Sequence, residues 1–160
     1  HFPSESVFAE GVAEAEAAGI PVHLTLNAPL YDNHTAGSLV QLAERAGWND
    51  PLPEGRGRGI AVTSCFESTA AHVAEVSVGA DGAIKVDKVH CGINCGTAVY
   101  PDAIRAQAEA GVIMGMSTAF HERVRFKDGG VYTANYDEYH ILRMSEVPEI
   151  EGYDPFLVEF

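Results

Sequence analysis

The stretch VAEVSVGADGAIKVDKVHCGIN, residues 73–94, carries the clearest strand pattern of this chain. Its first part alternates between residue types, so that Ala74, Val76 and Val78 share one side of an extended chain. The letters GADG at residues 79–82 have the composition of a turn, after which the chain returns as a second strand. The stretch therefore predicts a β-hairpin.

The apolar residues of the returning strand change phase along its length. Ile84 and Val86 lie on one side of the expected strand, whereas Val89 lies on the opposite phase. Because side chains alternate with a period of two, one extra residue is needed to bring both sets to the same face. We therefore expect a β-bulge near Asp87 and Lys88.

The next segment, YPDAIRAQAEAGVIMGMSTA at residues 100–119, predicts a helix that opens with Pro101. Helical spacing collects five residues into one largely apolar stripe: Ile104, Gln107, Gly111, Met114 and Thr118. Either this stripe is not fully buried, or its glutamine holds a ligand. From spacing alone, a core glutamine that bonds to neighbouring backbone is the favoured interpretation.

Gly111 and Gly115 stand four residues apart in the same expected helix. Glycine inside a helix costs about 1 kcal/mol relative to alanine, so two glycines suggest an offsetting contact. A strip without side chains would let another backbone or a flat ligand approach closely.

The remaining segments complete an α+β pattern of helices packed with antiparallel hairpins. Residues 4–21 and 35–48 predict two helices, and residues 122–139 predict a second hairpin around a DGG turn. The first helix would be capped by Ser4 or Ser6; the second would begin at Thr35, stop at Gly47 and pack through Leu39, Val40, Ala43 and Ala46.

The composition changes in a linker-like stretch at residues 49–59, NDPLPEGRGRG. We therefore divide the chain into a helical N-terminal segment, 1–54, and an α+β segment, 55–160. Residues 59–66 form a short apolar run, and residues 149–160 could start a further strand.

The charge balance excludes some classes of partner. The 160 residues contain 10 basic and 23 acidic residues, giving a formal net charge of −13. Unaided binding to nucleic acid or to an anionic membrane needs a basic footprint, which this chain lacks. No apolar run approaches the ~20 residues of a membrane span, so a soluble chain of undetermined compartment is expected.

The three cysteines, Cys65, Cys91 and Cys95, are too few for a disulfide scaffold. The letters HCGINC could suggest a metal site through His90, Cys91 and Cys95, but no second ligand pair stands nearby, so we expect none.

Several other motifs have an ordinary and a functional interpretation. GRGRG at residues 55–59 could cradle an anion, although a linker that turns into a strand is favoured. Ser68, Glu67 and His72 lack the glycine elbow of a nucleophile site, so we assign no catalytic residue there. A partner-binding surface or a solvated strand edge would explain Asn135, Tyr136, Tyr139, His140 and Arg143 equally well.

Four segments in this order resemble the molybdopterin-binding subunits of the xanthine dehydrogenase family, in the branch of the isoquinoline 1-oxidoreductase beta subunits. They are GRGRGIAV, VAEVSVGADGAIKVDKVHCGINCG, YPDAIRAQAEAGVIMGMSTA and NYDEYHILRMSEVPEIE. The resemblance is strong from Gly55 to Glu151 and weaker before it, and it implies that the α+β segment is part of a larger molybdopterin-binding domain.

The resemblance implies a molybdenum hydroxylase that oxidises aldehydes or N-heterocycles with oxygen from water. Molybdenum would be held by a pterin dithiolene in the cytosine dinucleotide form, with no protein side chain as metal ligand. Electrons would pass to an iron–sulfur partner subunit. By the same resemblance, Gln107 binds the cofactor and Gly111 permits its close approach.

The sequence also departs from the family pattern. Ala110 replaces the usual glycine after the glutamate, and Asn94 replaces the usual aspartate before the second cysteine. The family's catalytic glutamate lies in a glycine-rich segment after PEIE, so Glu146, Glu149, Glu151 and Glu159 are not assigned as the base. We therefore expect a partial subunit that is inactive without the rest of its subunit and its partner. The alternative is a non-catalytic interaction module derived from the family.

Overall fold

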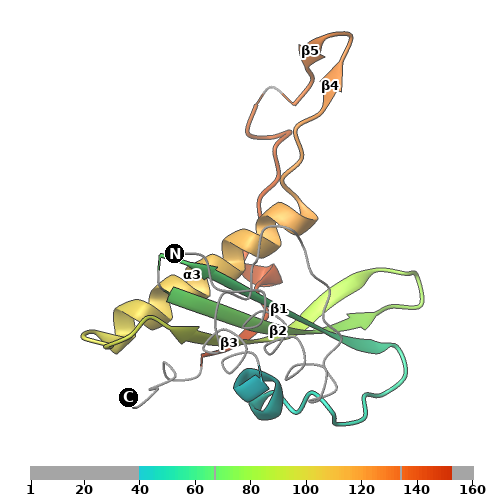
Figure 1. Cartoon of the computed structure of the whole chain (residues 1–160). Coiled ribbons are helices and arrows are strands. Elements are labelled where there is room, and N and C mark those ends of the chain that lie inside the picture. Colours follow the sequence, from blue (N-terminus) through green and yellow to red (C-terminus); the bar gives the residue numbers. More distant parts are fainter. Residues whose placement is uncertain (1–39, 67, 134, 153–160) are drawn as a thin grey trace, which may run out of the picture.

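The computed structural model describes residues 40–66, 68–133 and 135–152 (Figure 1). Its centre is a four-stranded sheet in the order β1-β2-β3-β6. The four strands are β1 Arg56–Cys65, β2 Ser68–Val78, β3 Ile84–Asn94 and β6 Glu149–Gly152. The first three are antiparallel neighbours, whereas β6 pairs with β3 in parallel. The α+β fold expected from the sequence is confirmed.

The hairpin at residues 73–94 forms as the alternation predicts. Gly82 occupies the left-handed region at φ 80°, and the Gly79 N–H donates to the Ala83 carbonyl across the turn. Glu75 pairs with Lys88, but the next residue on β2 pairs with Val86, so Asp87 is the extra residue. The bulge is therefore where the change of phase placed it.

Helices cover both faces of the sheet (Figure 1). Helix α3, Pro101–Phe120, packs Val112 against Val86 and Val89 of β3. The helical segment at residues 40–45 lies on the opposite face, where Leu42 packs with Val73 of β2.

Part of the expected second helix falls within the described residues. Ala43 and Ala46 are buried as expected, and so is Leu42, whereas Val40 is half-buried. Gly47 ends the helix with φ 62°, a conformation that suits glycine. The expected helix at residues 4–21, its caps Ser4 or Ser6, the cap Thr35 and Leu39 lie outside the described residues.

The second hairpin is much shorter than the sequence predicts. Its strands are β4 Phe126–Lys127 and β5 Gly130–Val131, joined through Asp128 and Gly129, both at positive φ. Residues 135–139 form turns instead of a strand. The hairpin projects away from the sheet (Figure 1), so no neighbouring strand extends its ladder.

The short 3-10 helix η1, Met144–Glu146, leads into β6. No helix in the described part of the chain is long and apolar enough to cross a bilayer.

Candidate functional site

Helix α3 has a buried face and an exposed face. The stripe of residues selected by helical spacing does not coincide with the buried face. Ala108, Val112 and Ser117 are buried, whereas Gln107 and Gly111 are exposed. The expectation of a core glutamine is therefore wrong: the stripe that contains it lies on the solvent side of the helix. Alanines and glycines give this helix little contrast between its sides, so spacing alone could not choose the packed face.

The exposed face of α3 is unusually open. A Cβ atom built on Gly111 or Gly115 would meet no atom within 4 Å outside the helix's own turns. Met114, between the two glycines, is 69% exposed. No hydrogen bond joins the Gln107 amide to the rest of the described chain. We call this surface, made of Gln107, Gly111, Met114 and Gly115, the α3 open face.

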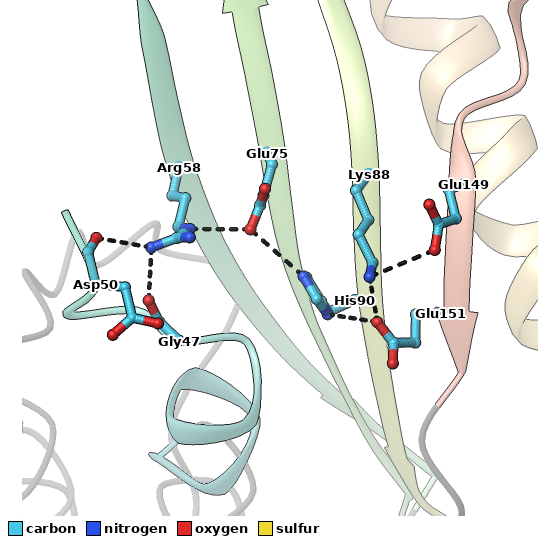
Figure 2. A network of polar contacts seen from close by, with 8 residues as sticks. All are labelled: Gly47, Asp50, Arg58, Glu75, Lys88, His90, Glu149 and Glu151. Atoms are coloured by element: carbon cyan, nitrogen blue, oxygen red, sulfur yellow. Dashed lines mark hydrogen bonds and ion pairs between the residues drawn. The ribbon is translucent and has the colours of Figure 1, made fainter. Parts of the chain in front are cut away.

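The opposite face of the sheet holds a chain of charged side chains that crosses all four strands (Figure 2). Arg58 of β1 donates from Nε to Glu75 Oε1 of β2 at 3.0 Å. Its Nη1 also donates to the main-chain carbonyls of Gly47 and Asp50, at 2.5 and 3.1 Å. The Arg58 and Glu75 side chains are 12% and 18% exposed, so this is a nearly buried ion pair.

The same network continues into β3 and β6 (Figure 2). The two ring nitrogens of buried His90 lie 3.5 Å from Glu75 Oε1 and 3.5 Å from Glu151 Oε2. Lys88 Nζ contacts Glu149 at 3.4 Å and Glu151 more closely. The hydrogen bond that Lys88 donates to Glu151 is the main cause that raises the pKa of Lys88. The network therefore ties β6 to the sheet and leaves Glu149 and Glu151 engaged.

Sequence reasoning did not find this network. Its members stand on separate strands, and the cross-strand register that joins them follows only from the folded sheet. The one available signal was the in-phase placement of Lys88 and His90 on the strand after the bulge.

The glycine–arginine motif at residues 55–59 is part of a strand. Arg56 opens β1, and Arg58 is committed to Glu75 and two carbonyls. The anion-cradle interpretation is therefore wrong for Arg58, because its guanidinium already has acceptors.

Cys91 and His72 face each other across β3 and β2. Cys91 Sγ lies 3.2 Å from His72 Nε2, on the face that α3 covers. Burial raises the pKa of the Cys91 thiol to about 11 and lowers the pKa of His72. Both shifts favour the neutral forms, which is the opposite of an activated thiolate–imidazolium pair. This pair is a structural contact, which agrees with assigning no catalytic role to His72.

His90 and Cys91 of the HCGINC motif, for which we expect no metal site, lie on opposite faces of β3. His90 belongs to the charged network, whereas Cys91 faces His72 on the other side of the sheet. Within the described residues, no group of three or more His, Cys, Asp or Glu side chains is placed to hold a metal ion.

The polar segment at residues 135–143 lies at the surface. Asn135, Tyr136 and Tyr139 line one shallow hollow with Thr133. His140 and Arg143 are exposed and do not line it. Tyr139 donates its hydroxyl to Glu122 Oε2 at 2.9 Å, so this residue supports the segment after α3.

The serine and glutamate that precede His72 in the sequence form no site with it in the described structure. Ser68 opens β2, four residues before His72, and Glu67 lies outside the described residues.

Comparison with protein families identifies the family of the chain. Residues 9–148 match the molybdopterin cofactor-binding domain. The chain belongs to this family. The matched range includes β1, β2, β3 and α3, and hence the α3 open face.

Curated relatives of this molybdopterin-binding chain are subunits of much larger size. It is 34% identical over 113 residues to the beta subunit of isoquinoline 1-oxidoreductase from Brevundimonas diminuta, covering 68% of this chain and 14% of the relative. It is 33% identical over 156 residues to a nicotinate dehydrogenase subunit from Pseudomonas putida, covering 86% of this chain and 13% of the relative. The chain thus spans about a seventh of the length of these relatives.

A solved structure agrees with the fold of this molybdopterin-binding chain. Quinoline 2-oxidoreductase from Pseudomonas putida 86 aligns with a TM-score of 0.51 at 24% identity, over 54% of this chain and 11% of that protein. At that identity the likeness concerns the fold alone.

The α3 open face fits a molybdopterin. Gln107 offers an exposed amide with donors and an acceptor, which suits the polar edges of a pterin. The positions beside Gly111 and Gly115 are clear, so a flat group could lie against the helix. The charged network fits less well, because its charged side chains are already paired with one another.

Proposed function

We propose that this chain contributes the α3 open face to the cofactor site of a molybdenum hydroxylase. Gln107 would bind the molybdopterin through its amide, and Gly111 would allow the cofactor to approach the helix. The observation that carries the proposal is the exposed Gln107 amide beside glycines with clear space, in a chain of the molybdopterin-binding family.

The finer features of the function belong to the same proposal. The cofactor would be the cytosine dinucleotide form, and the bound group would supply the redox chemistry by which oxygen from water enters the substrate. The substrate would be an aldehyde or an N-heterocycle; the relatives named for isoquinoline and nicotinate favour the heterocycle. An iron–sulfur subunit and the rest of the molybdopterin subunit would complete the enzyme.

The described residues play supporting parts in this chemistry. Gln107 would orient the cofactor and exclude water from the polar edge that it binds. Glu149 and Glu151 contact Lys88, so neither is a free carboxylate poised to act as a base. We therefore assign no catalytic base within the described residues.

Substitution of Gln107 tests the proposal. In the assembled enzyme, Gln107→Ala is expected to lower molybdenum and pterin content at least several-fold, because the amide contacts are lost. The fold of the chain should not change, because the Gln107 side chain is exposed. Gln41→Ala is the matched control, since Gln41 is also an exposed glutamine on a helix. Metal analysis and pterin fluorescence give the occupancy, and circular dichroism checks the fold.

Three outcomes are informative. Equal occupancy in Gln107→Ala and the wild type would show that Gln107 does not bind the cofactor. A natively purified complex without molybdenum or pterin would favour the alternative, a non-catalytic interaction module. Turnover of aldehydes or N-heterocycles by the purified 160-residue chain alone would contradict the expected need for further subunits.

A further inference from the structure

The hairpin after α3, residues 122–133, is an arm with a fixed root and a projecting tip (Figure 1). At the root, the Leu142 N–H donates to Ser117 Oγ at 3.0 Å, and the Tyr139 hydroxyl donates to Glu122. The hydrogen bonds from Ser117 and then from Tyr139 lower the pKa of Glu122, which keeps its carboxylate charged. The Glu122 N–H also donates to the Ser117 carbonyl at 3.0 Å, so the root of the arm is held to the end of α3 while its tip leaves the body of the molecule.

One side of the arm is apolar. Phe126 pairs with Val131 across the ribbon, and the two side chains are 74% and 54% exposed. Val124, two residues before Phe126, is 50% exposed. A two-stranded hairpin is marginally stable by itself in water. Large apolar side chains gathered on such a ribbon indicate a surface that another molecule covers.

The arm carries three basic and two acidic residues, so its net charge is +1 in a chain whose net charge is −13. Arg123, Arg125 and Lys127 alternate with the apolar residues and make up three of the ten basic residues in a chain of net charge −13. No ion pair joins them to other residues in the described part of the chain. The Tyr132 N–H donates to the Arg125 carbonyl at 2.7 Å, which keeps the two sides of the ribbon in register there.

We propose that this arm docks into a partner subunit of the same enzyme, against a protein surface that is acidic and has an apolar floor. Phe126 and Val131, on one face of the ribbon, would cover the floor, and the three basic side chains, on the opposite face, would meet carboxylates on the walls around it. The rest of the chain is strongly acidic and would repel nucleic acid or an anionic membrane, so a protein surface fits the charge best. The inference rests on the proposed function in taking the partner from that enzyme complex.

Zero-length carbodiimide coupling in the natively purified complex tests the docking. Lys127 is expected to form an amide with an aspartate or glutamate of another subunit, identified by mass spectrometry. Lys88 with Glu149, at 3.4 Å within this chain, serves as the internal control for the reagent. Coupling of Lys127 only within its own chain, to a second copy of the chain or to nothing would overturn the inference.

Variants of the arm supply a second, independent measurement. Phe126→Ser and the double variant Arg123→Glu with Arg125→Glu are expected to weaken retention of the partner at least tenfold, the charge variant more strongly at low salt. Met144→Ser is the control, because Met144 is 87% exposed but lies outside the arm. Retention equal to that of the control would contradict the docking.

The cofactor content of the same preparations separates the two proposals. If the arm variants lose the partner but retain molybdopterin, the result supports docking by the arm and does not contradict the proposed cofactor site. A cross-linked arm in a complex without cofactor would keep the docking and remove the proposed function. A chain that purifies without any partner would refute the docking, whatever its cofactor content.

Discussion

Cys91 and His72 show how burial alone sets the chemistry of two residues that could otherwise react. Their atoms lie 3.2 Å apart, a distance at which a thiolate and an imidazolium could form. The surroundings on the α3 side of the sheet are apolar, with Val89 two residues before Cys91 in the same strand. Desolvation therefore holds both groups in the neutral form.

This pair gives a prediction for the pH dependence of stability. The native thiol of Cys91 keeps its proton up to a pKa of about 11, whereas an unfolded thiol releases it near 9.0. Between these values the native state binds more protons, so the free energy of unfolding should fall as the pH rises from about 9 to 11. Urea denaturation at several pH values measures this slope.

Cys91→Ala is the comparison for that slope. Lys88 also has a raised pKa and contributes in the same direction at alkaline pH, but it is present in both proteins. The loss of stability should therefore be shallower in Cys91→Ala than in the wild type. Equal slopes in the two proteins would show that the thiol is not the group responsible.

Gln107 shows the limit of spacing at the scale of one residue. Its polar character identified it as unusual, but in a helix rich in alanine, glycine and methionine the sequence does not indicate which side is buried. The packed side follows from Val86 and Val89 on β3, which meet Val112. Resemblance to a family, and not helical periodicity, gave Gln107 its expected role.

At the scale of elements, the hairpin and its bulge were predictable and the charged network was not. The alternation of residue types in the local sequence predicts the two strands, and its change of phase predicts the extra residue, Asp87. The network instead needs the register between β1, β2, β3 and β6, and β6 follows β3 by more than fifty residues along the chain. Such long-range pairing leaves no periodic signal in the sequence.

The network gives a prediction about the stability of the sheet. Glu75→Gln keeps the shape of the side chain but removes the charge that faces Arg58 and His90. Hydrogen bonds to charged groups stabilise by about 1.5–3 kcal/mol, so we expect a loss of about 2 kcal/mol in the free energy of unfolding. Chemical denaturation of the 160-residue chain measures it.

Glu149→Gln is the matched control for the sheet. The Glu149 side chain is 71% exposed and contacts Lys88 at 3.4 Å, so its removal should change stability by less than about 0.5 kcal/mol. If the two glutamine variants destabilise the chain equally, the burial of Glu75 does not strengthen its contribution to stability.

In the whole molecule, the sheet separates two surfaces, and only one of them takes part in the proposed cofactor site. One face supports α3, whose outer side is open, and the other face carries the charged network beneath the segment at residues 40–50. The arm extends beyond both (Figure 1). The chain spans about a seventh of the length of its curated relatives, and both of our proposals place it in a larger assembly.

Oxidation of methionine by hydrogen peroxide tests whether molybdopterin covers the α3 open face. Met114 lies on the α3 open face and is 69% exposed, whereas Met144 is 87% exposed outside that face. Exposed methionines form the sulfoxide readily, and a bound group that covers the side chain slows the reaction. The measurement compares the enzyme complex assembled with and without its molybdenum cofactor, with each sulfoxide followed by peptide mass spectrometry.

We expect the cofactor to slow oxidation of Met114 several-fold and to leave the rate at Met144 unchanged. Equal rates at Met114 in the two complexes would contradict the claim that molybdopterin lies against this helix.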